Sequence, residues 1–446
     1  MLFSCALAAG PDIKRIYNVH SLPFYPGRSG ASTSRRRGIQ PPMSKRLKAV
    51  VLTISVAIVL LTISGGLGVS AAPGNDDSYR QLGVYTEVLS RIRSEYVEDP
   101  NISAVTNGAL HGLLEALDAN SSYLSASEYK QYKIRHRETK GNIGGTISKR
   151  FGYAAVISVI PGGPADKATL QNGDIVEAIE GKSTREMSLA EVTSMLGGEP
   201  GSKLNISVVR PRRPEPTRIT VVRDVVKIPA VSDRMLEDGI GYVKIDALTK
   251  GKSGEAAAKI KSLQSSGAKK LILDLREVSI GEESEGIATA NLFLDHGTIT
   301  YLQGQRYAKE TFNAEPQKAI TKLPLVVLVN RGTAGAAEIA AAAILENARG
   351  DVLGEKTYGV GSVQKLIEIP DGSALLLSIA KYYSPNGKAI QDTAVTPNIV
   401  VAGKADEFAM PDDEDGQPPE AQQAPRGPQP DDQLHRAIEV LKKQKV

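Results

Sequence analysis

The sequence predicts a multidomain α+β protein with an N-terminal helical hairpin, a β-rich module and an α/β core domain. Apolar residues recur at helical spacing within 79–135, and short β-branched runs separated by glycine and proline turns fill 141–226. Strand-like and helix-like segments then alternate through 237–402. A length of 446 residues allows several domains, and 41% hydrophobic with 23% charged residues excludes a wholly disordered chain.

Charge and cysteine content exclude several classes of protein. Residues 1–48 hold nine Lys or Arg and one Asp, a charge of +8, so the remaining residues carry −4 of the +4 total. A mildly acidic body has no basic surface for nucleic acid, and we expect no nucleic-acid partner. Because Cys5 has no second cysteine to pair with, disulfides within the chain and cysteine-ligated metal sites are excluded. The histidines lack ligand spacing, so we expect no metal and no cofactor: His20, His111, His136, His296 and His435.

The uncharged run at 49–72 is long enough to cross a membrane as a helix. Basic residues precede it and aspartates follow it, which places the rest of the chain on the extracytoplasmic, periplasmic side: Lys45, Arg46, Lys48, Asp76 and Asp77. The run is either an anchor in the cytoplasmic membrane or a cleaved signal peptide, because 69–72 resembles a cleavage site. Residues 1–48 form a basic segment predicted to be disordered, and Met43 is an alternative start.

Two helices are predicted at 79–97 and 103–117, within the hairpin of 79–135. Each has one apolar face: Leu82, Tyr85, Leu89, Ile92 and Tyr96 on the first, and Leu110, Leu113, Leu114 and Leu117 on the second. The core between them would be too small to stand alone. We therefore expect the hairpin to pack on the core domain or on a second subunit, which leaves a homo-oligomer open.

The β-rich module at 141–226 is predicted to contain three strands and a helix: Ala155–Val159, Ile175–Ile179, Leu204–Val209 and the helix Leu189–Leu196. Its sequence GNIGGTI at 141–147, followed by Pro164-Ala165 and Gly173-Asp174-Ile175-Val176, resembles a PDZ domain. The resemblance implies that this module binds protein or peptide C-termini. The backbone around Ile143, Gly144 and Gly145 would hold the terminal carboxylate, the strand at Ile147 would accept the peptide as an added strand, and Val192 would line a side-chain pocket.

The core domain at 237–402 is predicted to have strands Ile240–Ile245, Lys270–Leu275, Leu323–Asn330 and Ala374–Ala380, with helices Gly254–Ser265, Gly286–Leu294 and Gly335–Ala348. Between them, Glu282, Glu283 and Glu285 are expected to form a solvated loop. Residues 403–432 are rich in proline and acid and are predicted to be a disordered linker. Residues 433–446 follow as a terminal helix that should pack on the core.

An ordered series of motifs resembles the carboxyl-terminal processing proteases, serine peptidases that use a Ser–Lys pair. The motifs are LDANSSYL at 117–124, GYVKIDAL at 241–248, LILDLR at 271–276, the segment 329–364 and KYYSPNGKAIQ at 381–391. In that family a serine attacks the peptide carbonyl, a neutral lysine takes its proton, and a glutamine orients the lysine. Backbone N–H groups stabilise the oxyanion.

On this chain, the resemblance implies a glycine at the nucleophile position and a valine at the position of the base. Gly335 occupies the serine position, Val360 the lysine position, and Gln364 the glutamine position. The oxyanion region corresponds to Ala336, Ile280 and Gly281, in a turn that departs from the family's N-x-P-G-G pattern.

These substitutions predict a pseudoprotease that binds C-termini without cutting them. Two alternatives stay open. One is an active serine-type or threonine-type endopeptidase with relocated residues, for which Thr333, Lys356 and Ser362 are candidates, although Thr333 could instead cap the following helix. The other is a regulatory subunit that assembles with an active relative.

Overall fold

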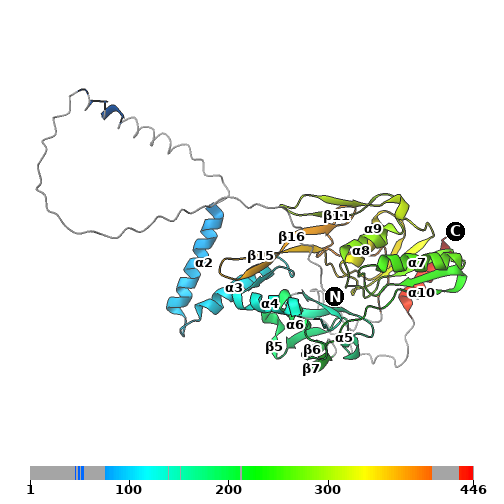
Figure 1. Ribbon diagram of the computed structural model, residues 1–446, viewed down its shortest axis with the longest axis horizontal. Coiled ribbons are helices and arrows are strands. Elements are labelled where there is room, and N and C mark those ends of the chain that lie inside the picture. The colour runs from blue at the N-terminus through cyan, green and yellow to red at the C-terminus, as the bar shows by residue number, and fades with distance from the viewer. Residues whose placement is uncertain are drawn as a thin grey trace, which may run out of the picture. The chain divides into compact units, whose positions relative to one another are not determined.

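The computed structural model describes residues 46, 49–50, 52–54, 76–138, 140–150, 152–210, 213–403 and 431–444 (Figure 1). The chain divides between Val105 and Thr106 into two compact units. Most of the segment 49–72 lies outside the described residues, as do 1–45 and 404–430, so the predicted anchor and linker are not described. Within the part that is described, no helix combines the length and apolar character needed to span a bilayer.

The two helices predicted near the N-terminus are present as α2 (Asp76–Glu95) and α3 (Ile102–Glu115). A third helix follows, α4 (Ala126–Glu138), which was not predicted from the sequence. On the expected apolar face of α2, Tyr85 and Leu89 are half-buried, whereas Leu82 stays 59% exposed. On α3, Leu114 is buried and Leu113 is 62% exposed. The apolar faces of these helices are therefore only partly covered.

The β-rich module is a sheet with the strand order β2-β3-β4-β6-β7, and β5 pairs with β4. The strands are β2 (Gly145–Arg150), β3 (Tyr153–Val159), β4 (Ile175–Ile179), β5 (Lys182–Ser183), β6 (Lys203–Arg210) and β7 (Arg213–Val222). Its helices are α5 (Pro164–Lys167) and α6 (Leu189–Leu196). Among the described strands β2 pairs with β3 alone, so one edge of β2 has no strand neighbour.

The core domain is built on a six-stranded sheet with the order β17-β14-β13-β10-β9-β8. The strands are β8 (Ser232–Met235), β9 (Ile240–Lys244), β10 (Lys270–Asp274), β13 (Leu325–Val329), β14 (Asp351–Gly354) and β17 (Ile399–Val400). All pairs are parallel except β8 with β9. Strands β10 and β13 are buried along their whole length, as expected for parallel strands covered on both faces.

Four helices accompany this sheet: α7 (Lys252–Ser265), α8 (Glu283–Asn291), α9 (Ala336–Glu346) and α10 (Asp432–Lys443). Helix α9 is buried from Ala336 to Ile344, and its alanines allow close packing against α8. A Cβ atom on Gly286 of α8 would lie 2.2 Å from the carbonyl oxygen of Ala336, so only glycine fits there. The first turn of α9 is thus fixed by contact with α8.

A second sheet contains β1 (Ser122–Leu124), β16 (Ala374–Tyr383), β11 (Thr298–Gln303) and β12 (Glu310–Asn313), with β15 (Ser362–Glu368) also paired to β16. Strand β1 comes directly after α3 and pairs antiparallel with residues 374–376 of β16. Strand β1, which lies within 79–135, is therefore part of the same sheet as β16 of the core. The sequence pattern predicted β16, whereas β1, β11, β12 and β15 were not predicted.

The strands and helices predicted for the module and the core are present, with ends shifted by a few residues. The prediction for the acidic cluster at 282–285 was wrong. Glu283 and Glu285 lie in the first turn of α8, where acidic side chains are favoured by the helix dipole. Glu285 also accepts hydrogen bonds from the N–H groups of Gly251 and Ser253, at 2.7 and 2.8 Å, at the start of α7.

An ion cluster ties the terminal helix α10 to the end of β10. Arg276 contacts Asp274 at 2.6 Å and Asp431 at 2.8 Å, and Asp431 in turn accepts a hydrogen bond from Leu434 at the start of α10. The hydroxyl of Tyr242 donates to Asp274 at 2.7 Å. Burial raises the pKa of Asp274, but Lys244 and Arg276 outweigh it and lower that pKa below its ordinary value. Asp274 is therefore ionised and balanced by Arg276.

Arg276→Met should lower the free energy of unfolding by about 1.5–3 kcal/mol, because it removes the closest charged hydrogen-bond partner of the carboxylate of Asp274, 1% exposed, and leaves Lys244 at 3.6 Å and the hydroxyl of Tyr242. Urea denaturation measures the change. Arg436→Met is the matched control, since Arg436 pairs with Glu439 on the surface of α10 and should change stability by no more than about 1 kcal/mol. Equal effects of the two substitutions would contradict the buried cluster.

Candidate functional site

Gly335 lies at the sharp turn that leads into α9. It is the residue before the helix and has φ 63° and ψ −121°. This left-handed backbone is strained for any residue with a side chain, and it is used at strand-to-helix turns that present a nucleophile. A Cβ atom on Gly335 would meet no other atom within 4 Å. The turn therefore has room for a side chain but carries none.

One buried carboxylate joins Gly335 to the loop that holds Val360. Oε2 of Glu338, a residue that is 0% exposed, accepts the N–H of Gly335 at 3.0 Å and the N–H of Val360 at 2.8 Å. Oε1 accepts the N–H of Gly359 at 2.8 Å and the hydroxyl of Thr357. The structure thus brings together the two positions that sequence comparison placed 25 residues apart. Glu338 was not predicted as a site residue, although it closes the motif at 333–338.

Burial governs the protonation of this carboxylate. Removal from water raises the pKa of Glu338 to about 7, against the lowering effect of the hydrogen bonds from Thr357, Val360, Gly335 and Gly359. The proton on Glu338 is therefore held to a higher pH in the folded chain than in the unfolded chain.

Gln364 belongs to a network of amides and hydroxyls that reaches Gly361, the residue after Val360. Nε2 of Gln364 donates to Oγ of Ser362 at 2.8 Å, and the amide of Asn120 donates to the same oxygen at 3.0 Å. The N–H of Gly361 donates to Oε1 of Gln391 at 3.0 Å. Val360 itself is half-buried. Gln364 thus binds a serine hydroxyl here and not an amine.

The candidate substitutes for a nucleophile and a base have other surroundings. The hydroxyl of Thr333 is 0% exposed, donates to the carbonyl of Leu275 at 2.9 Å and accepts the N–H of Asn330 at 3.0 Å. It does not cap α9, so that prediction was wrong; Gly335 and Glu338 form the start of the helix. Lys356 is exposed. The hydroxyl of Ser362 is an acceptor for Asn120 and Gln364.

The predicted oxyanion turn at 277–281 is held by contacts on both sides. The carbonyl of Ile280 accepts the N–H of Leu248 at 2.8 Å, and a Cβ atom on Gly281 would lie 2.7 Å from the backbone of Leu248. Glu277, with φ 63°, accepts hydrogen bonds from Asn172 of the β-rich module at 3.0 Å and from Asn330 at 2.6 Å.

Ser279 in the same turn also contacts the β-rich module. Its hydroxyl donates to Thr146 of β2 at 2.7 Å and lies against the hydroxyl of Ser158 in β3. The turn that leads to Ile280 and Gly281 is therefore in direct contact with the strand predicted to receive a peptide. Ala336, the third predicted oxyanion residue, is the first residue of α9 and is 6% exposed.

The residues predicted to bind a peptide form one end of the β-rich module. Gly144 has φ 72°, its N–H donates to the side chain of Asn142 at 3.1 Å, and its carbonyl accepts the N–H of Ile160 at 2.7 Å. Gly145 begins β2. Ile143, Ile147 on β2 and Val192 on α6 belong to one apolar core, with exposed fractions of 1%, 6% and 0%. The predicted glycine loop, strand and helix are thus assembled side by side.

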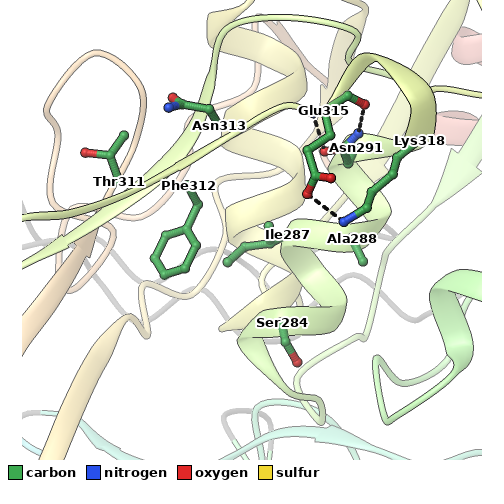
Figure 2. Close-up of a pocket in the computed structure, with 9 residues that line it drawn as sticks. All are labelled: Ser284, Ile287, Ala288, Asn291, Thr311, Phe312, Asn313, Glu315 and Lys318. Atoms are coloured by element: carbon green, nitrogen blue, oxygen red, sulfur yellow. Dashed lines mark hydrogen bonds and ion pairs between the residues drawn. The ribbon is translucent and has the colours of Figure 1, made fainter.

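A separate hollow of about 330 Å³ lies between α8 and β12. Figure 2 shows the side chains of Ile287 and Phe312 facing it, with the Glu315–Lys318 ion pair at its rim. None of the residues predicted to act in catalysis or peptide binding lines this hollow. Among the described residues, no group of three or more His, Cys, Asp or Glu side chains could hold a metal ion.

Comparison with known proteins identifies both folded parts. Residues 239–401 match the family model described as peptidase family S41, and residues 156–210 match the PDZ domain. The carboxy-terminal-processing protease of Bartonella bacilliformis is 32% identical over 330 residues, which cover 73% of this chain and 76% of that protein. The chain belongs to the carboxyl-terminal processing protease family.

Other members of the carboxyl-terminal processing protease family agree with this assignment. The carboxy-terminal processing protease CtpA of Bacillus subtilis is 30% identical over 366 residues, covering 80% of this chain and 78% of the relative. Among solved structures, the photosystem II D1 C-terminal processing protease superposes with a TM-score of 0.59 at 25% identity, covering 71% of this chain and 86% of that one. The predicted fold, a PDZ domain beside an S41 core, is confirmed.

Gly335→Ala should lower the free energy of unfolding by about 1–3 kcal/mol, because the backbone at φ 63° is strained for alanine although its side chain has space. The control is Gly112→Ala in α3, where a Cβ atom also meets nothing within 4 Å but the backbone is helical. That change should raise stability by about 0.5–1 kcal/mol. Chemical denaturation of both variants checks the difference in sign, and a neutral Gly335→Ala would contradict the strained turn.

The free energy of unfolding should fall as the pH rises from about 5 to 8. A carboxyl group whose pKa is raised on folding, to about 7 for Glu338, stabilises the fold fully below its unfolded pKa and loses that contribution as the pH passes through the folded value. Urea titrations across this range measure it. The variant Glu338→Gln, although less stable at every pH, should lack this component; the same slope in both proteins would refute it.

Proposed function

We propose that this chain is a pseudoprotease of the carboxyl-terminal processing protease family, which binds protein C-termini through its PDZ domain without cleaving them. The observation that carries the proposal is the turn at Gly335, which has the space and backbone of a nucleophile position but no side chain. Val360, joined to it through Glu338, offers a hydrocarbon where a base would stand.

The chemistry of amide hydrolysis supports this reading. A hydroxyl group becomes a nucleophile when a nearby base takes its proton. Glycine has no nucleophilic atom, and valine has no lone pair to accept a proton. Removing a nucleophile or its base from such a unit lowers the rate by roughly 10⁴–10⁶. Glu338 does not replace either group, because its two oxygens already accept four hydrogen bonds.

The alternative of an active endopeptidase with relocated residues has less support. The hydroxyl of Thr333 is buried and bonded to the carbonyl of Leu275, and Lys356 is exposed, so this pair lacks the contact expected of a nucleophile and its base. The second alternative is a regulatory subunit that assembles with an active relative, and exposed apolar residues such as Leu82 on α2 and Leu113 on α3 favour it.

The proposal includes a location. The uncharged run at 49–72, preceded by basic residues, would either hold the chain in the cytoplasmic membrane or direct its export before cleavage. The PDZ domain would then face extracytoplasmic proteins. Fractionation of cells, with a protease-accessibility assay on intact and opened cells, tests this part separately.

Two assays with the chain from residue 76 onward test the function itself. Peptides with a free C-terminal carboxylate should bind, and the same peptides with a C-terminal amide should bind at least about tenfold more weakly, because the glycine loop receives the charge. After prolonged incubation, mass spectrometry should detect no cleavage of either kind of peptide. Equal binding of acid and amide would refute C-terminal recognition, and cleavage by the natural chain would refute the pseudoprotease.

The variant Gly335→Ser/Val360→Lys supplies the matched comparison for cleavage. It restores a hydroxyl and an amine at the two positions that Glu338 joins, with no other change. Cleavage by this variant at a rate above the natural chain would support the assignment of the two positions. Equal cleavage by both proteins would contradict it.

A further inference from the structure

We propose that Lys149 selects ligands of the PDZ groove that carry an acidic residue about four positions before their C-terminal residue. The inference rests on the proposed function, since it assumes that a C-terminus binds along β2. It adds a specificity-determining residue and a ligand class: C-termini with an upstream carboxylate.

The geometry of β2 fixes where Lys149 meets a ligand. Gly144 and Gly145 stand at the start of β2, and Lys149 lies four residues further along, about 13 Å away. A peptide whose carboxylate is held at the glycine loop runs antiparallel to β2, so its upstream residues pass toward Lys149. The residue opposite Lys149 is then about four positions before the C-terminus.

The side chain of Lys149 is on the face of β2 that packs toward α6. Gly145, Ile147 and Lys149 alternate along the strand and share one face. Ile147 on that face packs in the same core as Val192 of α6. The ammonium group of Lys149 donates to the carbonyl of Met187, just before α6, at 2.6 Å. Lys149 therefore links β2 to the residue just before the segment that begins α6.

Lys149 already holds a carboxylate in this position. Its ammonium group pairs with Glu115, at the end of α3, while the Lys149 side chain is only 4% exposed. The side chain of Glu115 is 38% exposed and approaches from the solvent side. An ammonium group has three donors, and Met187 and Glu115 account for two of them. Because the Lys149 side chain is covered and Glu115 is the exposed member of the pair, a ligand carboxylate reaches the ammonium group by taking the place of Glu115.

Side chains directly opposite each other in an antiparallel pair lie on the same face, and opposite charges there stabilise the pairing. An acidic ligand residue opposite Lys149 thus gains a charge-assisted hydrogen bond in a site largely shielded from water. A basic residue there meets a like charge. The groove should discriminate between ligands by charge at this single position.

The test uses three labelled decapeptides with a C-terminal valine and Glu, Gln or Lys four residues before it. We expect the full natural chain to bind the Glu peptide about fivefold to tenfold more tightly than the Gln peptide, and the Lys peptide more weakly than either. In Lys149→Met, which keeps the apolar stem, the Glu and Gln peptides should bind equally. Lys203→Met, at an exposed lysine of β6, should keep the preference.

A fourth peptide, the Gln peptide with a C-terminal amide, separates this inference from the function on which it rests. If the amide binds as well as the acid, C-terminal recognition fails. If the acid form is preferred but Glu and Gln bind equally to the natural chain, recognition stands and the role of Lys149 is overturned. Glu115→Gln gives a further check, since removing the competing carboxylate should increase the preference for the Glu peptide.

Discussion

The geometry of the candidate site depends on one buried carboxylate. Glu338 binds the backbone N–H groups of Gly335, Gly359 and Val360, and so fixes the start of α9 to the loop before β15. A carboxyl group removed from water must satisfy its oxygens with hydrogen bonds, because an unpaired buried acceptor costs about 1–3 kcal/mol. Here four donors meet that demand. The spacing between positions 335 and 360 is thus set by backbone contacts and does not require a serine or a lysine.

The β-rich module is linked to this site through the turn at 277–281. Glu277 bonds to Asn172, and Ser279 bonds to Thr146 on β2 and lies against Ser158 on β3. The first of these strands is also the one whose free edge and glycine loop suit a peptide C-terminus. A ligand on β2 would therefore be linked to the turn that contains Ile280 and Gly281 through the hydrogen bond between Thr146 and Ser279. Peptide capture and the candidate site share a structural element, whatever chemistry the site performs.

The sequence predicted the fold well because its main elements have strong local patterns. The buried run Leu323–Asn330 and the alanine-rich segment after Gly335 correspond to β13 and α9 within two residues at each end. Strands β1 and β12 were missed because each is short, and β1 is in addition stabilised by β16, which is distant in the chain. The acidic residues at 282–285 were misassigned because their role is to begin α8 and to cap α7, which depends on tertiary contact.

The site was predicted in part. Motif comparison identified Gly335, Val360 and Gln364, but not Glu338, whose role appears only when the loop at 357–360 folds against α9. The absence of a reacting pair is the central claim, and acyl trapping tests it most directly. The natural chain is incubated with an activated acyl ester, and intact and peptide mass spectrometry locate any adduct. The account predicts no acyl ester on the hydroxyl of Thr333 or Ser362, and it counts a stable amide on the exposed Lys356 as surface labelling; an adduct on either hydroxyl that forms and then hydrolyses would contradict it.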